Sequence, residues 1–249
     1  MKEKKETRKD GNQFTIEGLS ALSEFVKFRP DRIRQIFCKQ SAEGKVRRLL
    51  SDCSQQKLPL QVLNEMDKRD RGPVSALVEV HVVDFQTAQQ RFQKRAGADL
   101  VLALDHIVDP RNLGAIVRSA AFFGVREVIV PRTRQVLLTE ASVGTSQGAF
   151  ALTDLVLVPN LVRALEILKD FGYWILAADG EGEAFQKNVG MFDKVVLVLG
   201  AEQDGVSALV KKKADKLIGI TGAKRSVESL NVSVAAGILL HSFSHSTVS

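Results

Sequence analysis

The stretch DLVLALDHIVDPRNLGAIVRSAAFFGVREVIVP, residues 99–131, reads as a strand, a helix and a second strand. Two apolar runs, 99–107 and 126–131, flank an amphipathic segment that ends at Gly124. Continuously apolar strands joined through a helix are typical of a parallel sheet covered on both faces. The stretch therefore predicts an α/β fold, whose ligands bind outside the carboxyl ends of the strands.

The same alternation continues to the end of the chain. A helix is expected after Asn160, with that residue as its N-cap, and another after Asn231. Further strands are expected at 153–159, 173–179, 194–200 and 215–220. Together with residues 99–131, these segments form one domain, 99–249.

The first hundred residues have a different texture. Residues 1–12 are polar and are expected to be a disordered leader. Residues 13–81 predict a small α/β module, and the Gln- and Arg-rich segment 82–98 is interpreted as a linker. Within the module, helices are expected at 16–28 and 45–56, and strands at 32–39, 58–63 and 74–80.

The positive charge is concentrated in this N-terminal part. Residues 1–98 hold 20 Lys and Arg against 13 Asp and Glu, whereas the remainder holds 15 against 16. Such an asymmetry indicates a polyanion-binding region, because Lys and Arg that neutralise phosphates drive nucleic-acid affinity. A basic tail alone is the alternative, but the first ten residues carry only five Lys and Arg against three acidic residues.

Several classes of protein are disfavoured by composition. Cys38 and Cys53 form no CxxC pair, and His241 and His245, although spaced i, i+4, have no evident third ligand, so no metal is expected. No apolar run approaches the roughly 18 residues that span a bilayer, and no hydrophobic segment follows the charged N-terminus. A cytoplasmic location is the resulting expectation.

Polar residues follow three of the predicted strands. In the first junction, Asn112 by itself is best explained as a helix cap. Arg118 lies on an otherwise apolar helix, where it either extends to solvent or, if buried, binds an anion, and the sequence favours neither. In the second junction, Gly200 and Gly205 bracket a loop that contains Glu202, for which Arg118 is the natural partner. This loop lacks the Lys-Ser/Thr of a P-loop, so it predicts either a turn or a site other than one for nucleoside triphosphates.

The third junction leads into the stretch SVESLNVSVAAGILLH, residues 226–241. Ser226, Glu228, Ser229 and Asn231 precede a helix of small and apolar residues. Helix capping needs one such residue, whereas several polar groups at one helix mouth indicate a ligand site. The small residues of the helix favour close packing against another element or another chain.

The three junctions, in this order, resemble the three motifs of the SpoU (TrmH-like) family of SPOUT-class RNA ribose methyltransferases. The resemblance covers residues 100–245 and is carried by NLGAIVRSAAFFG, LVLGAEQDGVS and IGITGAKRSVESLNVSVAAGI. It implies a trefoil-knotted, mostly parallel sheet, S-adenosylmethionine as the cofactor and a homodimer. The N-terminal module is similar to the accessory substrate-binding domain of the family, which is related to a ribosomal protein fold.

The resemblance also implies roles for individual residues. The cofactor-binding set is Leu199, Gly200, Ile220 and Leu230, and the reaction-site set is Asn112, Arg118, Glu202, Ser229 and Asn231. The expected activity is methyl transfer to a ribose 2′-hydroxyl, with large-subunit ribosomal RNA as the favoured substrate and transfer RNA as the alternative. Arg118 would position a phosphate and stabilise the developing alkoxide, because a guanidinium resists deprotonation.

Two departures from the family pattern leave other functions open. Gln203 stands where glycine is common, and Thr221-Gly222 replaces a usual proline in a loop that is one residue longer. They motivate a noncatalytic RNA-binding or ribosome-assembly factor as the alternative. Methylation of a base instead of a ribose is least favoured, because no carboxylate pattern for a ring nitrogen is evident beyond Glu202.

Overall fold

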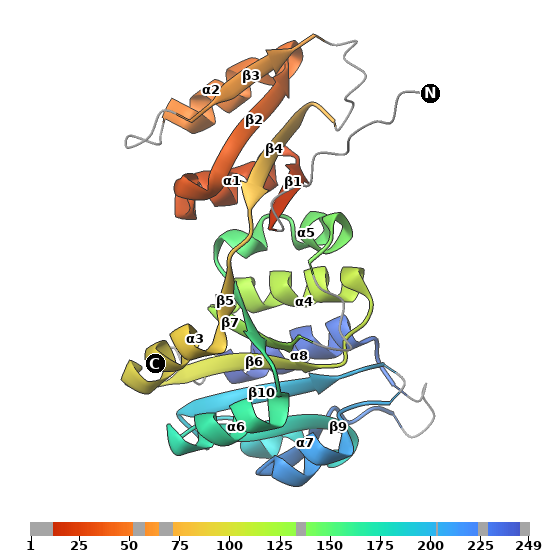
Figure 1. Cartoon of the computed structure of the whole chain (residues 1–249). Helices are drawn as coiled ribbons and strands as arrows, with labels where there is room; N and C mark the ends of the chain where they lie inside the picture. Colours follow the sequence, from red (N-terminus) through yellow and green to blue (C-terminus); the bar gives the residue numbers. More distant parts are fainter. Residues whose placement is uncertain are drawn as a thin grey trace, which may run out of the picture.

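The computed structural model describes residues 12–51, 58–64, 72–132, 138–202, 204–223 and 229–244. These residues form a four-stranded sheet followed by a seven-stranded sheet (Figure 1). The helices are α1 (Leu19–Phe28), α2 (Glu43–Ser51), α3 (Phe85–Lys94), α4 (Pro110–Phe122), α5 (Glu140–Ser146), α6 (Leu161–Asp170), α7 (Ala208–Lys213) and α8 (Val232–Ser244). The strands are β1 (Gln13–Glu17), β2 (Ile33–Lys39), β3 (Leu60–Leu63), β4 (Val74–Glu79), β5 (Val82–Asp84), β6 (Asp99–Asp105), β7 (Glu127–Pro131), β8 (Asp154–Val158), β9 (Trp174–Ala184), β10 (Lys194–Gly200) and β11 (Lys216–Gly219).

The seven-stranded sheet has the order β11-β9-β10-β6-β7-β8-β5, and all of its paired strands are parallel. Every residue of the central strand β6 is buried. Alternate residues of the central strands join two different apolar clusters, as expected when both faces are covered. The predicted α/β fold with a parallel sheet is confirmed.

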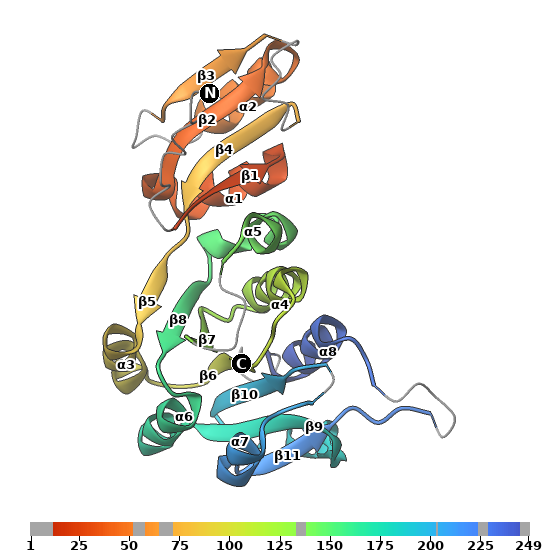
Figure 2. The same ribbon diagram turned by 45° about the vertical axis from the view of Figure 1, so that its right-hand side comes forward.

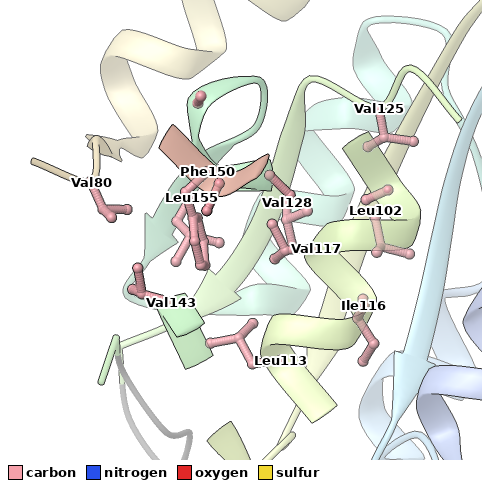
Figure 3. Close-up of a cluster of buried hydrophobic side chains, with 14 of the residues drawn as sticks. Val80, Leu102, Leu113, Ile116, Val117, Val125, Val128, Val143, Phe150 and Leu155 are labelled. Carbon is pink, nitrogen blue, oxygen red and sulfur yellow. The ribbon is translucent and has the colours of Figure 1, made fainter. Parts of the chain in front are cut away.

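Helices cover the two faces of this sheet in two groups (Figure 2). Helices α4, α5 and α8 contribute to one cluster, and α3, α6 and α7 to the other. Figure 3 shows part of the first cluster, in which Leu113, Ile116 and Val117 of α4 lie near Val128 of β7 and Leu102 of β6. Because the paired strands all run in the same direction, their carboxyl ends, and the loops that follow them, lie at one edge of the sheet.

The N-terminal sheet has the order β1-β4-β2-β3 and packs on α1 and α2. Its core is continuous with the first cluster of the larger sheet. It contacts the larger sheet through α5 and the following short helix Ala149–Ala151, and the Thr15 amide donates to the Glu140 carboxylate at 3.1 Å. Strand β1 was not expected: residues 16 and 17 were predicted to belong to a helix over 16–28, but they pair with β4, and α1 begins at Leu19.

Segment 82–98 differs from its interpretation as a linker. It holds β5, the edge strand of the seven-stranded sheet, and α3, which covers that sheet. Only Ala88 and Phe92 of α3 are buried, so most of its residues are polar and its sequence gives little sign that the helix packs on the sheet. The expected leader falls almost wholly outside the described residues.

Candidate active site

A cavity of about 420 Å³ lies at the carboxyl ends of β10 and β11 and beside the middle of β9. All four residues expected to bind the cofactor line it, namely Leu199, Gly200, Ile220 and Leu230. Glu202 and Ser229 of the expected reaction-site set also line it, as does the Thr221-Gly222 pair that departs from the family pattern. The second and third junctions therefore meet at one cavity, whereas Gln203 lies outside the described residues.

Gly200 ends β10 where the following loop folds back against it. Ala201 and Gly205 exchange backbone hydrogen bonds of 3.1 and 2.9 Å. A Cβ atom at position 200 would lie 2.0 Å from the carbonyl carbon of Gly205. Only glycine fits this approach of backbone to backbone, which holds the loop containing Glu202 at the mouth of the cavity.

Three side chains from the three junctions form one polar cluster at this mouth. The Asn112 amide donates to Oε1 of Glu202 at 3.1 Å, and the Asn231 amide donates both to Oδ1 of Asn112, at 3.1 Å, and to Glu202. The Oδ1 atom of Asn231 accepts from the backbone N–H of Ser233 at 2.9 Å. Asn231 therefore both caps α8 and belongs to the polar cluster. The two interpretations of the start of α8, a helix cap and a ligand site, are compatible.

Asn112 differs from its interpretation as a helix cap. The N-cap of α4 is Asp109, whose carboxylate accepts from the backbone N–H of Arg111 at 2.7 Å, with Pro110 at the first helical position. Asn112 lies in the first turn and is 9% exposed. Its amide is thus free to bond Glu202, which lies 90 residues away in sequence.

Arg118 does not pair with Glu202, contrary to the expectation. Its side chain is exposed on α4, and no hydrogen bond or ion pair within the described ranges involves it. The two amides of Asn112 and Asn231 occupy Glu202 instead. Ser229 is likewise exposed and lines the cavity without joining the cluster.

The middle of β9 supplies site residues that were not predicted from the sequence. Ala178, Asp179 and Gly180 line the cavity. The Lys211 ammonium that pairs with Asp179, together with the Glu181 backbone N–H, lowers the pKa of the Asp179 carboxyl below its ordinary value. A signal was present in the sequence, because Asp179 is the acidic last residue of the otherwise apolar predicted strand 173–179.

A second cavity, of about 600 Å³, adjoins the first. Ala201, Glu202, Gly205 and Val232 line both. The second cavity is also lined by Asn112 and by His106, which no sequence pattern singled out. His106 adopts a left-handed backbone conformation with φ of 63°, which is uncommon for a residue other than glycine and is found at functional sites.

Two further sequence expectations concern metals and membranes. Within the described ranges, no group of three or more His, Cys, Asp and Glu residues is placed to hold a metal ion. The His241 ring packs edge-on against Phe123 at 5.8 Å, and His245 lies outside those ranges. In the same part of the chain, no helix is long and apolar enough to cross a bilayer.

Comparisons with known proteins identify the family of the chain. The profile of the SpoU rRNA Methylase family matches residues 99–241. The 23S rRNA (guanosine-2′-O-)-methyltransferase RlmB of Coxiella burnetii is 34% identical over 236 residues, which are 91% of this chain and 93% of that protein. RlmB of Escherichia coli K12 is 33% identical over 232 residues, or 90% and 95% of the two chains.

A solved structure extends the comparison to the fold. The SpoU methyltransferase AviRb from Streptomyces viridochromogenes, in complex with AdoMet, superposes with a TM-score of 0.77 at 20% identity, over 94% of this chain and 90% of AviRb. At this identity the likeness concerns the fold alone, and it extends over both sheets. Given the family match and the two full-length relatives, the chain belongs to the SpoU rRNA Methylase family.

Proposed function

We propose that this protein transfers the methyl group of S-adenosylmethionine to a ribose 2′-hydroxyl of large-subunit ribosomal RNA. The observation that carries the proposal is the cluster of Asn112, Glu202 and Asn231 at the mouth of the 420 Å³ cavity. Three junctions that are far apart in sequence meet there. Their residues can therefore contact both reactants, the cofactor and the ribose.

The first cavity fits the cofactor in size and in chemistry. Its volume lies within the usual range for small-molecule sites. Backbone groups at Gly200 and Ile220 and the apolar side chains of Leu199 and Leu230 suit an adenosine, and the charged Asp179 suits a cation. S-adenosylmethionine would supply an electrophilic methyl group on a positively charged sulfur.

The protein residues would then align the acceptor hydroxyl. Alignment alone can lower such a barrier by about 7 kcal/mol or more. Asn112 and Asn231 hold Glu202 in one orientation. Since Asn231 already donates both of its amide N–H groups, the second N–H of Asn112 and the hydroxyl of Ser229 would bind the ribose. Arg118 is free to bind the RNA phosphate and to stabilise negative charge that develops on the 2′-oxygen.

The choice of RNA rests on the relatives and on charge. Both full-length relatives are named as 23S rRNA guanosine-2′-O-methyltransferases. We place recognition of folded RNA in residues 13–81, whose basic residues suit contacts to the phosphate backbone, and methyl transfer in residues 99–249. The similarity of the first unit to a ribosomal protein fold is part of this proposal, as are a cytoplasmic location and the trefoil knot.

A homodimer completes the proposal. The outer sides of α4 and α8 expose Phe122 (83%) and Val234 (50%), and Arg118 is exposed on the same α4. Burying these side chains against a second copy would place Arg118 at a shared interface. Val234→Lys should give monomers in sedimentation velocity, whereas Leu209→Lys, on the distant α7, should leave the dimer intact.

Nucleoside mass spectrometry tests the activity. Purified protein is incubated with isotopically labelled S-adenosylmethionine and with ribosomal RNA that lacks this modification. We expect label on a 2′-O-methylguanosine of the large-subunit RNA, lost in Asn231→Ala. Asn160→Ala is the matched control, because Asn160 also caps a helix, through a bond to the Arg163 N–H, but lies on α6 away from the site.

Two outcomes would contradict the proposal. Label on a base would indicate a different reaction class. Absence of label, with RNA binding intact, would favour the noncatalytic RNA-binding factor that the Thr221-Gly222 loop and Gln203 first suggested.

A further inference from the structure

The second cavity adjoins the cofactor cavity but has a different lining. Its wall is shared with the first cavity at Ala201, Glu202, Gly205 and Val232, so a reactant in one lies beside a reactant in the other. If S-adenosylmethionine occupies the first, the nucleotide that receives the methyl group has the second available to it. The volume of about 600 Å³ is ample for a nucleoside.

Charge decides which part of the nucleotide enters. Asp109, Glu202 and Asp204 line this cavity, and no Lys or Arg of the described ranges does. Three carboxylates disfavour a phosphate by like-charge repulsion. The occupant is therefore an uncharged part of the nucleotide, either the base or the ribose.

His106 provides a planar surface in this cavity. Its Nδ1 lies 2.7 Å from Oδ1 of Asp105, a residue that is only 2% exposed. The other carboxylate oxygen of Asp105 accepts from the Ser207 N–H at 2.8 Å, so the carboxylate is fixed on both sides. The contact with Asp105 restrains the ring, which remains 39% exposed, and aromatic rings of this kind stack on extruded bases in RNA-binding proteins.

Asp204 provides an unused acceptor. Asp109 already accepts from the Arg111 N–H, and Glu202 accepts from two amides. In the part of the chain that the structure covers, the Asp204 carboxylate has no hydrogen bond or ion pair, and the residue is exposed and lines the cavity. Ionised carboxylates only accept hydrogen bonds, so this group selects a ligand with donors.

Among the four bases, guanine alone presents two adjacent donors, N1–H and the 2-amino group, on its Watson–Crick edge. Adenine and cytosine each pair a donor with an acceptor there, and uracil places one donor between two acceptors. We propose that the second cavity is the subsite for the target base, in which guanine stacks on His106 and donates both hydrogen bonds to Asp204. This inference rests on the proposed function and adds the residues that select the base.

The test compares three bases at one position. A synthetic RNA hairpin that spans the methylated nucleotide carries guanosine, inosine or adenosine there. Inosine keeps N1–H and lacks the 2-amino group. Since hydrogen bonds to charged groups are strong, the wild-type protein should methylate guanosine at least about tenfold faster than inosine, measured as kcat/KM, and adenosine more slowly still.

The variants separate the two contacts. Asp204→Asn should reduce the preference for guanosine over inosine to near unity, whereas Asp170→Asn, the same change at an exposed position on α6, should keep it. Asparagine tolerates a left-handed backbone, so His106→Asn is the matched change for the ring. It should lower the rates of methylation of guanosine and inosine equally and preserve the ratio of the two rates. An unchanged ratio in Asp204→Asn would overturn the assignment of Asp204, and unchanged rates in His106→Asn would overturn stacking.

A binding measurement keeps the result independent of turnover. Guanosine and inosine monophosphates are titrated into protein saturated with S-adenosylhomocysteine, with the His106 ring resonances as the NMR readout. If the wild-type protein prefers the guanine nucleotide and Asp204→Asn abolishes that preference, the subsite is supported. If in addition no RNA is methylated, only the proposed activity fails. Equal binding of the two nucleotides, with active enzyme, would overturn the subsite and leave the activity standing.

Discussion

The two edges of the seven-stranded sheet carry polar residues of opposite kinds. At the amino edge, Asp99, Glu127 and Asp154 are the first residues of β6, β7 and β8, and all three are buried. At the carboxyl edge, Glu202 and Asn231 are exposed, and Glu202 lines both cavities. The contrast suggests that one edge stabilises the fold and the other performs chemistry.

At the amino edge every buried carboxylate is paired. Arg95 donates to Asp99 at 2.8 Å and to Glu127 at 2.9 Å, and the Tyr173 hydroxyl donates to Asp99 at 2.5 Å. Burial raises the pKa of Tyr173, and its hydrogen bond to Asp99 raises it further. Such a network holds charges that would be costly to leave alone.

At the carboxyl edge the polar groups are only partly satisfied. Asp204 has no hydrogen bond or ion pair within the described residues, and His106 has a backbone conformation that costs free energy. Arg118, farther along α4, lines neither cavity and is likewise unpaired among the described residues. Polar groups without a protein partner contribute less to the stability of the fold than polar groups that are already paired. The comparison therefore predicts loss of stability from changes at the first edge and loss of activity from changes at the second.

The largest effect is expected from Arg95→Ala. This change leaves Asp99 and Glu127 buried without their partner, which costs about 3–5 kcal/mol for a buried pair. For a chain of this size the melting temperature should fall by roughly 6–20 °C. Calorimetry checks this, with Arg163→Ala as the control, since the Arg163 side chain is 69% exposed and its ion pair should contribute little.

A large effect on activity alone is expected from Arg118→Ala. Loss of one group that stabilises developing charge lowers the rate by about 10²–10³-fold in other enzymes, and we expect a decrease of that order in kcat/KM. The melting temperature should not change, because the side chain is exposed and unpaired in the described part of the chain. Arg111→Ala, which changes an exposed residue in the first turn of the same helix, should retain most activity. Equal losses in both variants would mean that Arg118 contributes only its positive charge and has no specific role.

An intermediate effect is expected from Gly200→Ala. The added methyl group would overlap the Gly205 backbone, and such overpacking costs about 1–3 kcal/mol. Displacement of the loop should also weaken S-adenosylmethionine binding by about tenfold or more in calorimetric titration. Gly180→Ala is the matched control, because Gly180 lines the same cavity and a Cβ there meets no atom within 4 Å.

The smallest effect is expected in the pH dependence of stability. Burial of Asp154 favours its neutral form, but hydrogen bonds from Arg91 and His81 and the charge of Arg32 lower its pKa below the ordinary value of 3.8. A lowered folded-state pKa gives stability that is present above the unfolded value and is lost as pH falls through the folded value. Urea unfolding should show the wild-type advantage over Asp154→Asn shrinking as the solution is acidified; an advantage that grows in acid would contradict this assignment.

Much of the larger sheet could be predicted, because long apolar runs such as 99–105 and 194–200 can only be buried. Segment 82–98 could not, since β5 has three residues and α3 turns only Ala88 and Phe92 toward the core. Helix α5 has a polar sequence; it begins with a capping box at Thr139 and packs against α4 and β1. Short or one-sided elements of this kind depend on tertiary contacts that leave little periodicity.

Part of the residues at the two cavities could be predicted from the sequence, but their arrangement could not. Resemblance to the family gave all four residues expected at the cofactor cavity, which do line one cavity. The link between Asn112 and Glu202 joins residues 90 positions apart, and no local pattern reports such a contact. His106 gave no signal, because its role depends on a backbone angle and on the buried Asp105 beside it.

The most direct test of the contrast between the two edges uses the same substitution at both. Methyl transfer and melting temperature are measured for Glu202→Gln and Glu127→Gln, at a temperature where both proteins are folded. The account predicts that Glu202→Gln melts like the wild type and loses methyl transfer, whereas Glu127→Gln melts lower and keeps it. Full activity in Glu202→Gln, or equal loss of activity in both variants, would contradict the assignment of chemistry to the carboxyl edge.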